Sequence, residues 1–201
     1  MKIQFEQKPY EEARIKAVLG LWSHVSYSFY WMSIMSMKPP KQLSLVCRLG
    51  ILDQNLNDLT ENYGEYDAIL LTEWDHEYPP DTLEILWNSN KPVVSGLYRS
   101  RQQRYRPIMA GKELKDGGIE YNVRDVPDKL FQTDWTGLGC MLVRKEVFDV
   151  LKKPFFDPIK KGIDRDFCKK LKDAGLEIWI NPKAQVGHLM SDVNWPVSVK
   201  K

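Results

Sequence analysis

The sequence has few cysteines, little net charge and no run of apolar residues long enough to dominate it. Its three cysteines, Cys47, Cys140 and Cys168, are odd in number and lack the close pairing of a zinc knuckle or a redox motif. Twenty-nine Lys and Arg against 27 Asp and Glu leave a net charge of only +2, so the overall field does not predict nucleic-acid binding. We therefore expect a reduced intracellular protein.

Segments that would target the chain or anchor it in a membrane are also lacking. The N-terminus continues through a polar stretch, residues 7–14, without the apolar core of a signal peptide, so we expect the mature chain to begin here. Residues 20–37 contain no Lys, Arg, Asp or Glu, but their five serines and His24 argue against spanning a bilayer. We expect a buried or interfacial amphipathic helix there, which leaves peripheral membrane contact open.

The length of 201 residues fits one domain over residues 1–201, with a sizeable core. In the first half, short apolar runs alternate with helical segments, as in parallel strands joined by crossover helices. The predicted strands are residues 15–19, 43–47, 68–71 and 92–97, and the predicted helices are residues 26–37, 52–61 and 81–88. The fold class is α/β, with a mixed, mainly parallel sheet flanked by helices.

The second half of the chain is less regular. The run Lys-Asp-Gly-Gly at residues 115–118 predicts a hairpin turn, and residues 131–136 and 140–143 predict strands. One further helix starts near Lys145. Another covers residues 165–174, where Gly175 is placed to act as a left-handed C-terminal cap.

Acidic residues and a histidine directly follow the third predicted strand. In open α/β sheets, ligands lie beyond the carboxyl ends of the strands, and Glu73, Asp75 and His76 occupy such a loop. If the segment is extended, Glu73 and Asp75 project to one side, where two carboxylates and a diphosphate suffice to hold Mg²⁺ or Mn²⁺. The alternative is a solvated turn facing the positive end of the next helix, and the local pattern alone favours it.

Three separated stretches, in the same order, resemble glycosyltransferases of the family-2 type with the GT-A fold. Residues 66–98, "YDAILLTEWDHEYPPDTLEILWNSNKPVVSGLY", are similar to the segment in which a strand ends in an Asp-x-Asp motif. Residues 136–148, "TGLGCMLVRKEVF", resemble the glycine-containing acceptor-side segment, and residues 162–188 resemble the Glu-Asp helix with its following strand and histidine. The short length is also similar to that of compact archaeal-virus glycosyltransferases, which implies the host cytoplasm as the location.

The resemblance implies a GT-A-like, Rossmann-related fold and a metal-dependent enzyme. Such an enzyme moves a sugar from a nucleotide-diphosphate-sugar donor to a hydroxyl of a glycan, protein or lipid acceptor. Residues 1–98 would form the nucleotide-sugar side, and residues 99–201 the acceptor and catalytic side. A metal is needed chemically, because breaking the sugar–phosphate bond leaves charge on a diphosphate.

Individual roles follow from the same resemblance. Asp75 would bind Mn²⁺ or Mg²⁺, with Glu73 in the first acidic position, where the family usually has Asp, and His188 as a further ligand. Asp164 would be the general base, with Asp166 as the fallback. Inversion is expected, although two departures from the family, Glu73 in place of Asp and Ile163 in place of Glu, leave retention open. From the residues alone, Asp164 is predicted to be a helix N-cap, a role that would lower its basicity.

Other candidate residues have less specific signals. Arg99, Arg101, Arg104 and Arg106 form the strongest local positive cluster, which fits a diphosphate clamp, a single-stranded nucleic-acid patch or a solvated loop. Arg48 is a nucleotide-side candidate by position only. Trp135, Gly137 and Gly139 could form an acceptor wall, with core packing as the alternative for Trp135.

Two other functions use the same features. A nucleotidyltransferase of related fold also needs paired carboxylates and a divalent metal. A nucleic-acid-binding module would use only residues 99–106, without any accompanying RNA-binding motif, so we expect no nucleic-acid partner.

Overall fold

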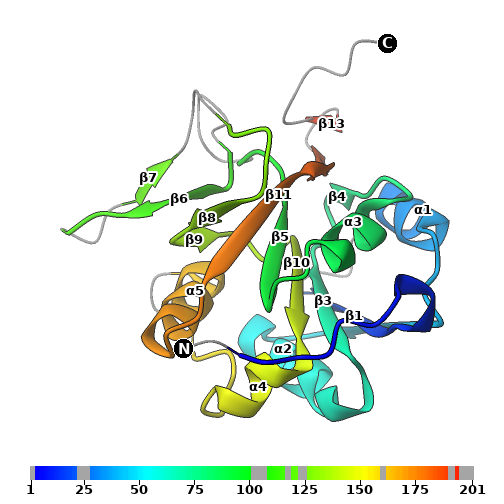
Figure 1. Ribbon diagram of the computed structural model, residues 1–201, viewed down its shortest axis with the longest axis horizontal. Helices are drawn as coiled ribbons and strands as arrows, with labels where there is room; N and C mark the ends of the chain where they lie inside the picture. Colours follow the sequence, from blue (N-terminus) through cyan, green and yellow to red (C-terminus); the bar gives the residue numbers. More distant parts are fainter. Residues whose placement is uncertain are drawn as a thin grey trace.

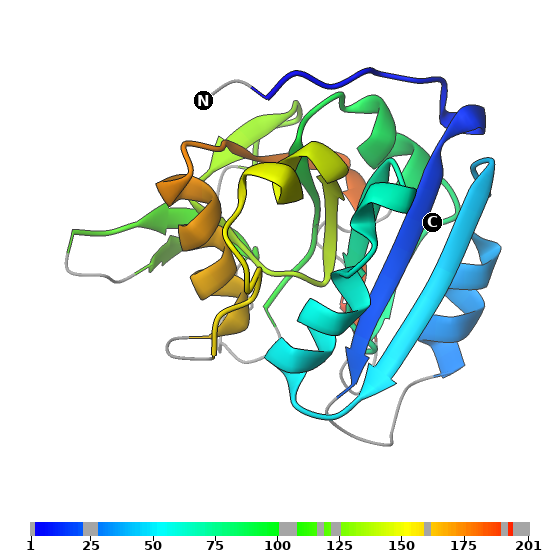
Figure 2. The ribbon, with the colours of Figure 1, turned by 90° about the horizontal axis from the view of Figure 1, so that it is seen from below.

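Seven strands form one mixed sheet at the centre of the molecule, with helices against both faces (Figure 1 and Figure 2). This computed structural model describes residues 3–21, 28–100, 108–115, 119–121, 126–158, 162–189 and 193–194. The strand order is β2-β1-β3-β10-β5-β11-β8. The strands are β1 (Arg14–Leu21), β2 (Gln42–Leu49), β3 (Ala68–Thr72), β5 (Val93–Leu97), β8 (Phe131–Thr133), β10 (Cys140–Arg144) and β11 (Ile178–Gln185).

Five of these strands run in one direction, and β10 and β8 run in the other. The predicted α/β class with a mainly parallel sheet is therefore confirmed, as are the four strands predicted in the first half. The placement of β10 between β3 and β5 was not predicted, because strand order depends on tertiary pairing.

The helices divide between the two faces of the sheet, and a separate hydrophobic core cluster lies on each face. They are α1 (Ser28–Ser36), α2 (Leu52–Thr60), α3 (Thr82–Asn88), α4 (Lys145–Val150) and α5 (Ile163–Asp173). Buried side chains of α1 and α3 pack on one face, and those of α2, α4 and α5 on the other. Strand side chains alternate between the faces: Leu70 lies in the first cluster, and Ile69 and Leu71 lie in the second.

Two small sheets lie beside the central one. The first is β13-β12-β4, formed by β4 (His76–Glu77), β12 (Gly187–Leu189) and β13 (Val193–Asn194). The second is β7-β6-β9, formed by β6 (Ala110–Glu113), β7 (Ile119–Tyr121) and β9 (Trp135–Thr136). The antiparallel pairing of β6 and β7 confirms the predicted hairpin, although its turn at residues 116–118 lies outside the described part of the chain.

Two sequence predictions need correction. The single strand predicted for residues 131–136 is two strands, β8 and β9, which belong to different sheets; Asp134 between them donates its N–H to the carbonyl of Gly111. Helix α5 starts at Ile163, two residues before its predicted start, and its N-cap position belongs to Gly162, whose φ of 123° suits glycine. At its other end, Gly175 has φ 74° as predicted.

The C-terminus of α5 forms a Schellman motif. The N–H of Gly175 donates to the carbonyl of Lys172, and the N–H of Leu176 donates to that of Leu171. Within the described residues, no helix combines the length and the apolar character needed to cross a bilayer. The charge-free segment that was predicted to be a helix contains α1, and its residues 22–27 lie outside the described part.

Candidate metal centre and surrounding site

The acidic segment, residues 73–77, directly follows β3 and lies at the carboxyl edge of the central sheet. Directly after Thr72 the chain turns at Trp74 and Asp75 and enters β4 at His76. The segment is a turn and not the extended stretch that was predicted, but the two carboxylates still converge: Nδ1 of His76 lies 3.1 Å from Oδ1 of Asp75 and 3.9 Å from Oε2 of Glu73. Asp75 points inward and is 3% exposed, whereas the side chain of Glu73 is 37% exposed.

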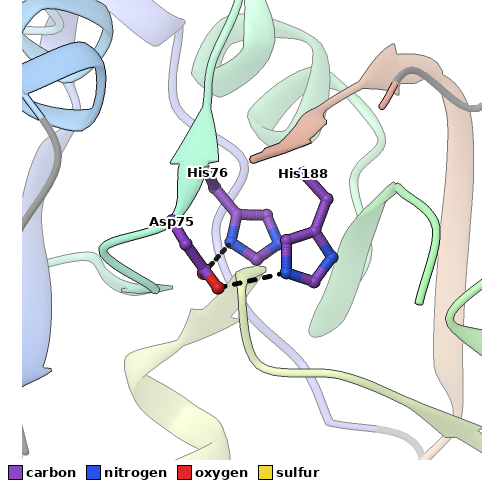
Figure 3. Close-up of side chains that lie close together, drawn as sticks. All are labelled: Asp75, His76 and His188. Carbon is purple, nitrogen blue, oxygen red and sulfur yellow. Dashed lines mark hydrogen bonds and ion pairs between the residues drawn. The ribbon is translucent and has the colours of Figure 1, made fainter. Parts of the chain in front are cut away.

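A cross-strand pair brings two histidines together. His76 of β4 lies directly opposite His188 of β12 in the antiparallel register. Their rings stack with centroids 4.3 Å apart and an interplanar angle of 23° (Figure 3). Paired side chains on one face of neighbouring strands are close by geometry, so this small sheet sets the histidine pair.

Both oxygens of Asp75 meet these rings. Oδ1 lies 3.1 Å from Nδ1 of His76, and Oδ2 lies 3.2 Å from Nε2 of His188 (Figure 3). Burial by itself would raise the pKa of the Asp75 carboxyl, but the hydrogen bonds and positive charge of the two histidines outweigh it and lower that pKa well below its usual range. Asp75 is therefore a buried carboxylate that stays ionised.

The backbone fixes the tautomer of His188. Its Nδ1 lies 2.6 Å from the carbonyl oxygen of Arg99, which can only accept a hydrogen bond, so Nδ1 carries a proton. In neutral His188 the Nε2 atom then presents a lone pair to the ionised carboxylate of Asp75. Two lone pairs at this distance repel unless a cation, either a proton or a metal ion, lies between them.

These three residues form a group with metal-ligand geometry. Asp75, His76 and His188 each offer one ligand atom, and these atoms lie within 4.8 Å of one another. The Glu73 carboxylate stands outside this group, 3.9 Å from Nδ1 of His76. Imidazole and carboxylate together suit Mn²⁺ or another transition-metal ion better than Mg²⁺, which prefers oxygen ligands alone.

The glycine loop between β9 and β10 packs against the site. A Cβ on Gly139 would lie 2.5 Å from Nε2 of His76, and a Cβ on Gly137 would lie 2.2 Å from the hydroxyl of Tyr98. Only residues without a side chain allow this approach. Both glycines therefore let the loop reach the side chains of the site.

Two buried tyrosines hold Gly139 in place. Its N–H donates to the hydroxyl of Tyr98 at 2.9 Å, and its carbonyl accepts from the hydroxyl of Tyr78 at 2.5 Å. The Tyr98 ring also lies edge-on to His76, with centroids 4.6 Å apart. Tyr78 and Tyr98 are functional candidates that sequence reasoning missed, because an apolar neighbourhood predicts only core packing for them.

Asp164 lies in the first turn of α5, a helix that packs against β9, where the thiol of Cys168 donates to the carbonyl of Thr136. Burial raises the pKa of the Tyr98 hydroxyl, and the charges of Glu73 and Asp164 raise it further. Asp164 itself is half-buried, and desolvation raises the pKa of its carboxyl to about 6. The N-cap prediction for Asp164 is wrong, since Gly162 holds that position, and so the expected loss of basicity does not follow.

The fallback residue has a different environment. Asp166 lines a surface pocket between α4 and α5, together with Lys169, Lys170 and Asp173. Two positions along a helix separate side chains by more than a right angle, so Asp164 and Asp166 project in different directions.

The remaining predicted residues are spread around this site. Arg48, at the end of β2, is exposed and forms an ion pair with Asp58 of α2. Arg99 is half-buried and contributes its carbonyl to His188, while Arg101 lies outside the described residues. Trp135 is 7% exposed within the second core cluster, so the structure favours its core-packing alternative over the acceptor wall.

Comparisons with known proteins give structural matches only. No protein-family model matches the sequence, and no curated protein sequence is recognisably similar. Among solved structures, A197 from the archaeal virus STIV superposes with a TM-score of 0.64 at 14% identity, covering 88% of this chain and 86% of that one. GalNAc-T7, in a structure with UDP, GalNAc and Mn²⁺, superposes with a TM-score of 0.60 at 12% identity.

The GalNAc-T7 match covers 90% of this chain and 44% of the other, so the chain spans less than half of that protein. At these identities the similarity establishes the fold alone. The central sheet, its flanking helices and these superpositions agree with the expectation from sequence. The protein therefore has a GT-A-like α/β fold.

Proposed function

We propose that this protein is a metal-dependent glycosyltransferase, which moves a sugar from a nucleoside-diphosphate sugar to an acceptor hydroxyl. The observation that carries the proposal is the buried group Asp75, His76 and His188 at the carboxyl edge of β3. This edge is where open α/β sheets bind nucleotides. The fold shared with GalNAc-T7, whose structure contains UDP, GalNAc and Mn²⁺, supports the same reading.

The chemistry of the donor set fits a bound cation. Asp75 stays ionised, and His188, whose Nδ1 donates to the carbonyl of Arg99, directs Nε2 toward it, so that either a proton or a metal ion fits between the two residues. Asp75 and His188 would hold Mn²⁺, with His76 as a third ligand or as a hydrogen-bond donor to Asp75. When bound, the metal neutralises charge on the departing diphosphate.

Asp164 is proposed as the general base. With a pKa of about 6, its carboxylate is ionised at neutral pH yet more basic than an ordinary aspartate. It would accept the proton of the acceptor hydroxyl as that oxygen attacks the sugar. A direct attack of this kind inverts the anomeric centre. Glu73, whose carboxylate lies 3.9 Å from Nδ1 of His76, would contact a metal-bound water or the donor.

The decisive experiment measures metal-dependent binding of nucleoside diphosphates by thermal shift, with Mn²⁺ and with Mg²⁺. A ligand that binds only the folded protein raises its melting temperature. We expect stabilisation that requires the metal, is stronger with Mn²⁺, and disappears in Asp75→Asn. The matched control is Asp81→Asn, because Asp81 is an exposed acid before α3 and outside the metal group.

Products then separate glycosyl transfer from nucleotidyl transfer. Release of nucleoside diphosphate from a nucleotide sugar supports the proposal, whereas release of pyrophosphate assigns the site to nucleotidyl transfer instead. Absence of any metal-dependent binding of nucleoside diphosphates by the wild-type protein would refute both.

A further inference from the structure

Strand β2 forms one edge of the central sheet. Within the described residues it pairs only with β1. Its eight residues, QLSLVCRL, contain one charged side chain and no proline. Edge strands are usually kept from pairing by charges, prolines, bulges or short length. β2 has few of these protections.

The direction of the backbone groups of β2 follows from two hydrogen bonds. The N–H of Gln42 donates to the carbonyl of Ala13, and that of Gly50 donates to the carbonyl of Leu21, so even-numbered residues direct their N–H groups toward β1. Because this direction alternates along a strand, the N–H groups of odd-numbered residues face away from the sheet. Only another peptide backbone supplies a matching ladder of donors and acceptors.

Large apolar side chains are exposed beside this edge. Helix α1 carries Phe29, Met32 and Met35, which are 53%, 69% and 80% exposed, and Leu49 at the end of β2 is 43% exposed. Helix α1 lies alongside β2 (Figure 2), and its buried side chains share a core cluster with Leu43 and Leu45. An exposed apolar face next to an open strand edge is typical of an interaction surface.

We propose that this edge is a self-association surface, on which β2 of a second copy pairs antiparallel across a twofold axis. The axis stands perpendicular to the sheet, so the two α1 helices lie on the same face and their exposed Phe29, Met32 and Met35 side chains meet. This proposal is independent of the proposed function.

A second copy matches this edge, because its own β2 is uncharged apart from Arg48 and its own α1 carries the same exposed apolar side chains. Arg48 is the only charged residue of β2, and its guanidinium is already paired with Asp58 on α2. Antiparallel pairing about the middle of β2 places each Arg48 opposite the start of the other strand, so the two arginines stay apart. A lipid surface would cover the apolar face of α1 but would leave the outward N–H and C=O groups of β2 unpaired.

The test is the mass in solution, measured by light scattering after size exclusion over roughly a hundredfold range of concentration, because dimerisation follows mass action. The wild type should have twice the monomer mass of 23.5 kDa. The double variant Met32→Glu, Met35→Glu should fall to the monomer mass, since both side chains are largely exposed and their loss leaves the core intact. The control Leu114→Glu, a 43% exposed apolar residue after β6, should stay dimeric.

Cys47 gives a second readout. It is the exposed cysteine on β2, whereas burial raises the pKa of Cys140 and Cys168 to about 12 and makes their thiols unreactive. A short bismaleimide should join two copies through Cys47, and Cys47→Ser should abolish the linked dimer. The proposal is overturned if the wild type is monomeric at every concentration, whether or not it then binds lipid vesicles. It is also overturned if the double variant Met32→Glu, Met35→Glu remains dimeric.

Discussion

Nε2 of His188 lies 3.2 Å from Oδ2 of Asp75, although 113 positions separate the two residues in sequence. The pairing of β4 with β12 creates this contact, and the carbonyl of Arg99 determines which ring nitrogen faces the carboxylate. A neutral imidazole in this tautomer has no proton to donate to Asp75. The contact therefore needs either a second proton on the imidazole or a metal ion between the two residues, and in the second case the geometry of the site is that of a metal-binding pair.

Replacing His188 by Ala should weaken Mn²⁺ binding by more than about 100-fold, because losing a ligand costs more than losing a supporting residue, which costs about 10- to 100-fold. Isothermal titration calorimetry with Mn²⁺ alone measures the dissociation constants of the wild type and of the variant. The comparison variant is Glu73→Gln, whose carboxylate lies outside the metal group, 3.9 Å from Nδ1 of His76, and which should lower the affinity less than His188→Ala does. Equal losses in both variants would put Glu73 among the ligands.

Gly139→Ala should disturb the site through a single added methyl group. Its Cβ would lie 2.5 Å from Nε2 of His76, so the imidazole or the loop must shift. We expect Mn²⁺ affinity to fall by about 10- to 100-fold, as for other groups that orient metal ligands, together with a lower melting temperature. Gly64→Ala is the matched control, because nothing lies within 4 Å of its added Cβ. Unchanged affinity in Gly139→Ala would show that the contact with His76 does not matter for the metal.

Tyr98→Phe should destabilise the protein by about 1–3 kcal/mol, because it leaves the buried N–H of Gly139 without its acceptor. Urea denaturation monitored by circular dichroism measures this loss. Tyr63→Phe removes a hydroxyl that bonds the exposed carboxylate of Asp149, and it should cost much less. If both substitutions lower the free energy of unfolding by the same amount, the buried hydrogen bond to Gly139 stabilises the protein no more than the exposed one does.

Asp164 makes the stability of the protein depend on pH in a defined direction. Its pKa rises from 3.8 when unfolded to about 6 in the folded state, so the unfolded chain loses this proton first as the pH increases. Asp164 therefore makes its full contribution to the free energy of unfolding below about pH 4, and this contribution is lost as the pH rises from about 4 to about 6. At about 1.4 kcal/mol for each pH unit between the two values, the loss is at most about 3 kcal/mol.

The variant Asp164→Asn should remove this loss. Its melting temperature should exceed that of the wild type at pH 7 to 8, by about 2–4 °C for each kcal/mol regained in a chain of this size, and should match it near pH 4. Sugar transfer should be abolished at the same time, since the amide cannot accept the proton. In the wild type, the transfer rate should fall as the pH drops through about 6. A variant that is less stable at pH 7 than the wild type, or that remains active, would contradict this role.

Much of the fold could be predicted from local pattern. The charge-free helix α1, the apolar run of β3 and the left-handed Gly175 each follow from residues that are neighbours in sequence, so periodicity and glycine chemistry identified them. The break at Asp134 was missed because the residues on both sides have strand character. The separation of β8 from β9 depends on which strands they pair with.

The sequence by itself determined that the protein is an α/β chain whose acidic segment follows a buried strand at the edge where ligands bind. Only the tertiary structure decided which side chains meet there. The turn after Thr72 buries Asp75 and exposes Glu73, and the β4–β12 register sets His76 against His188. Helix α5 starts at Ile163, so Asp164 lies in its first turn, where desolvation raises the pKa of its carboxyl to about 6. The burial of Asp75 and the pairing of the two histidines depend on contacts between segments far apart in the chain, which no local pattern encodes.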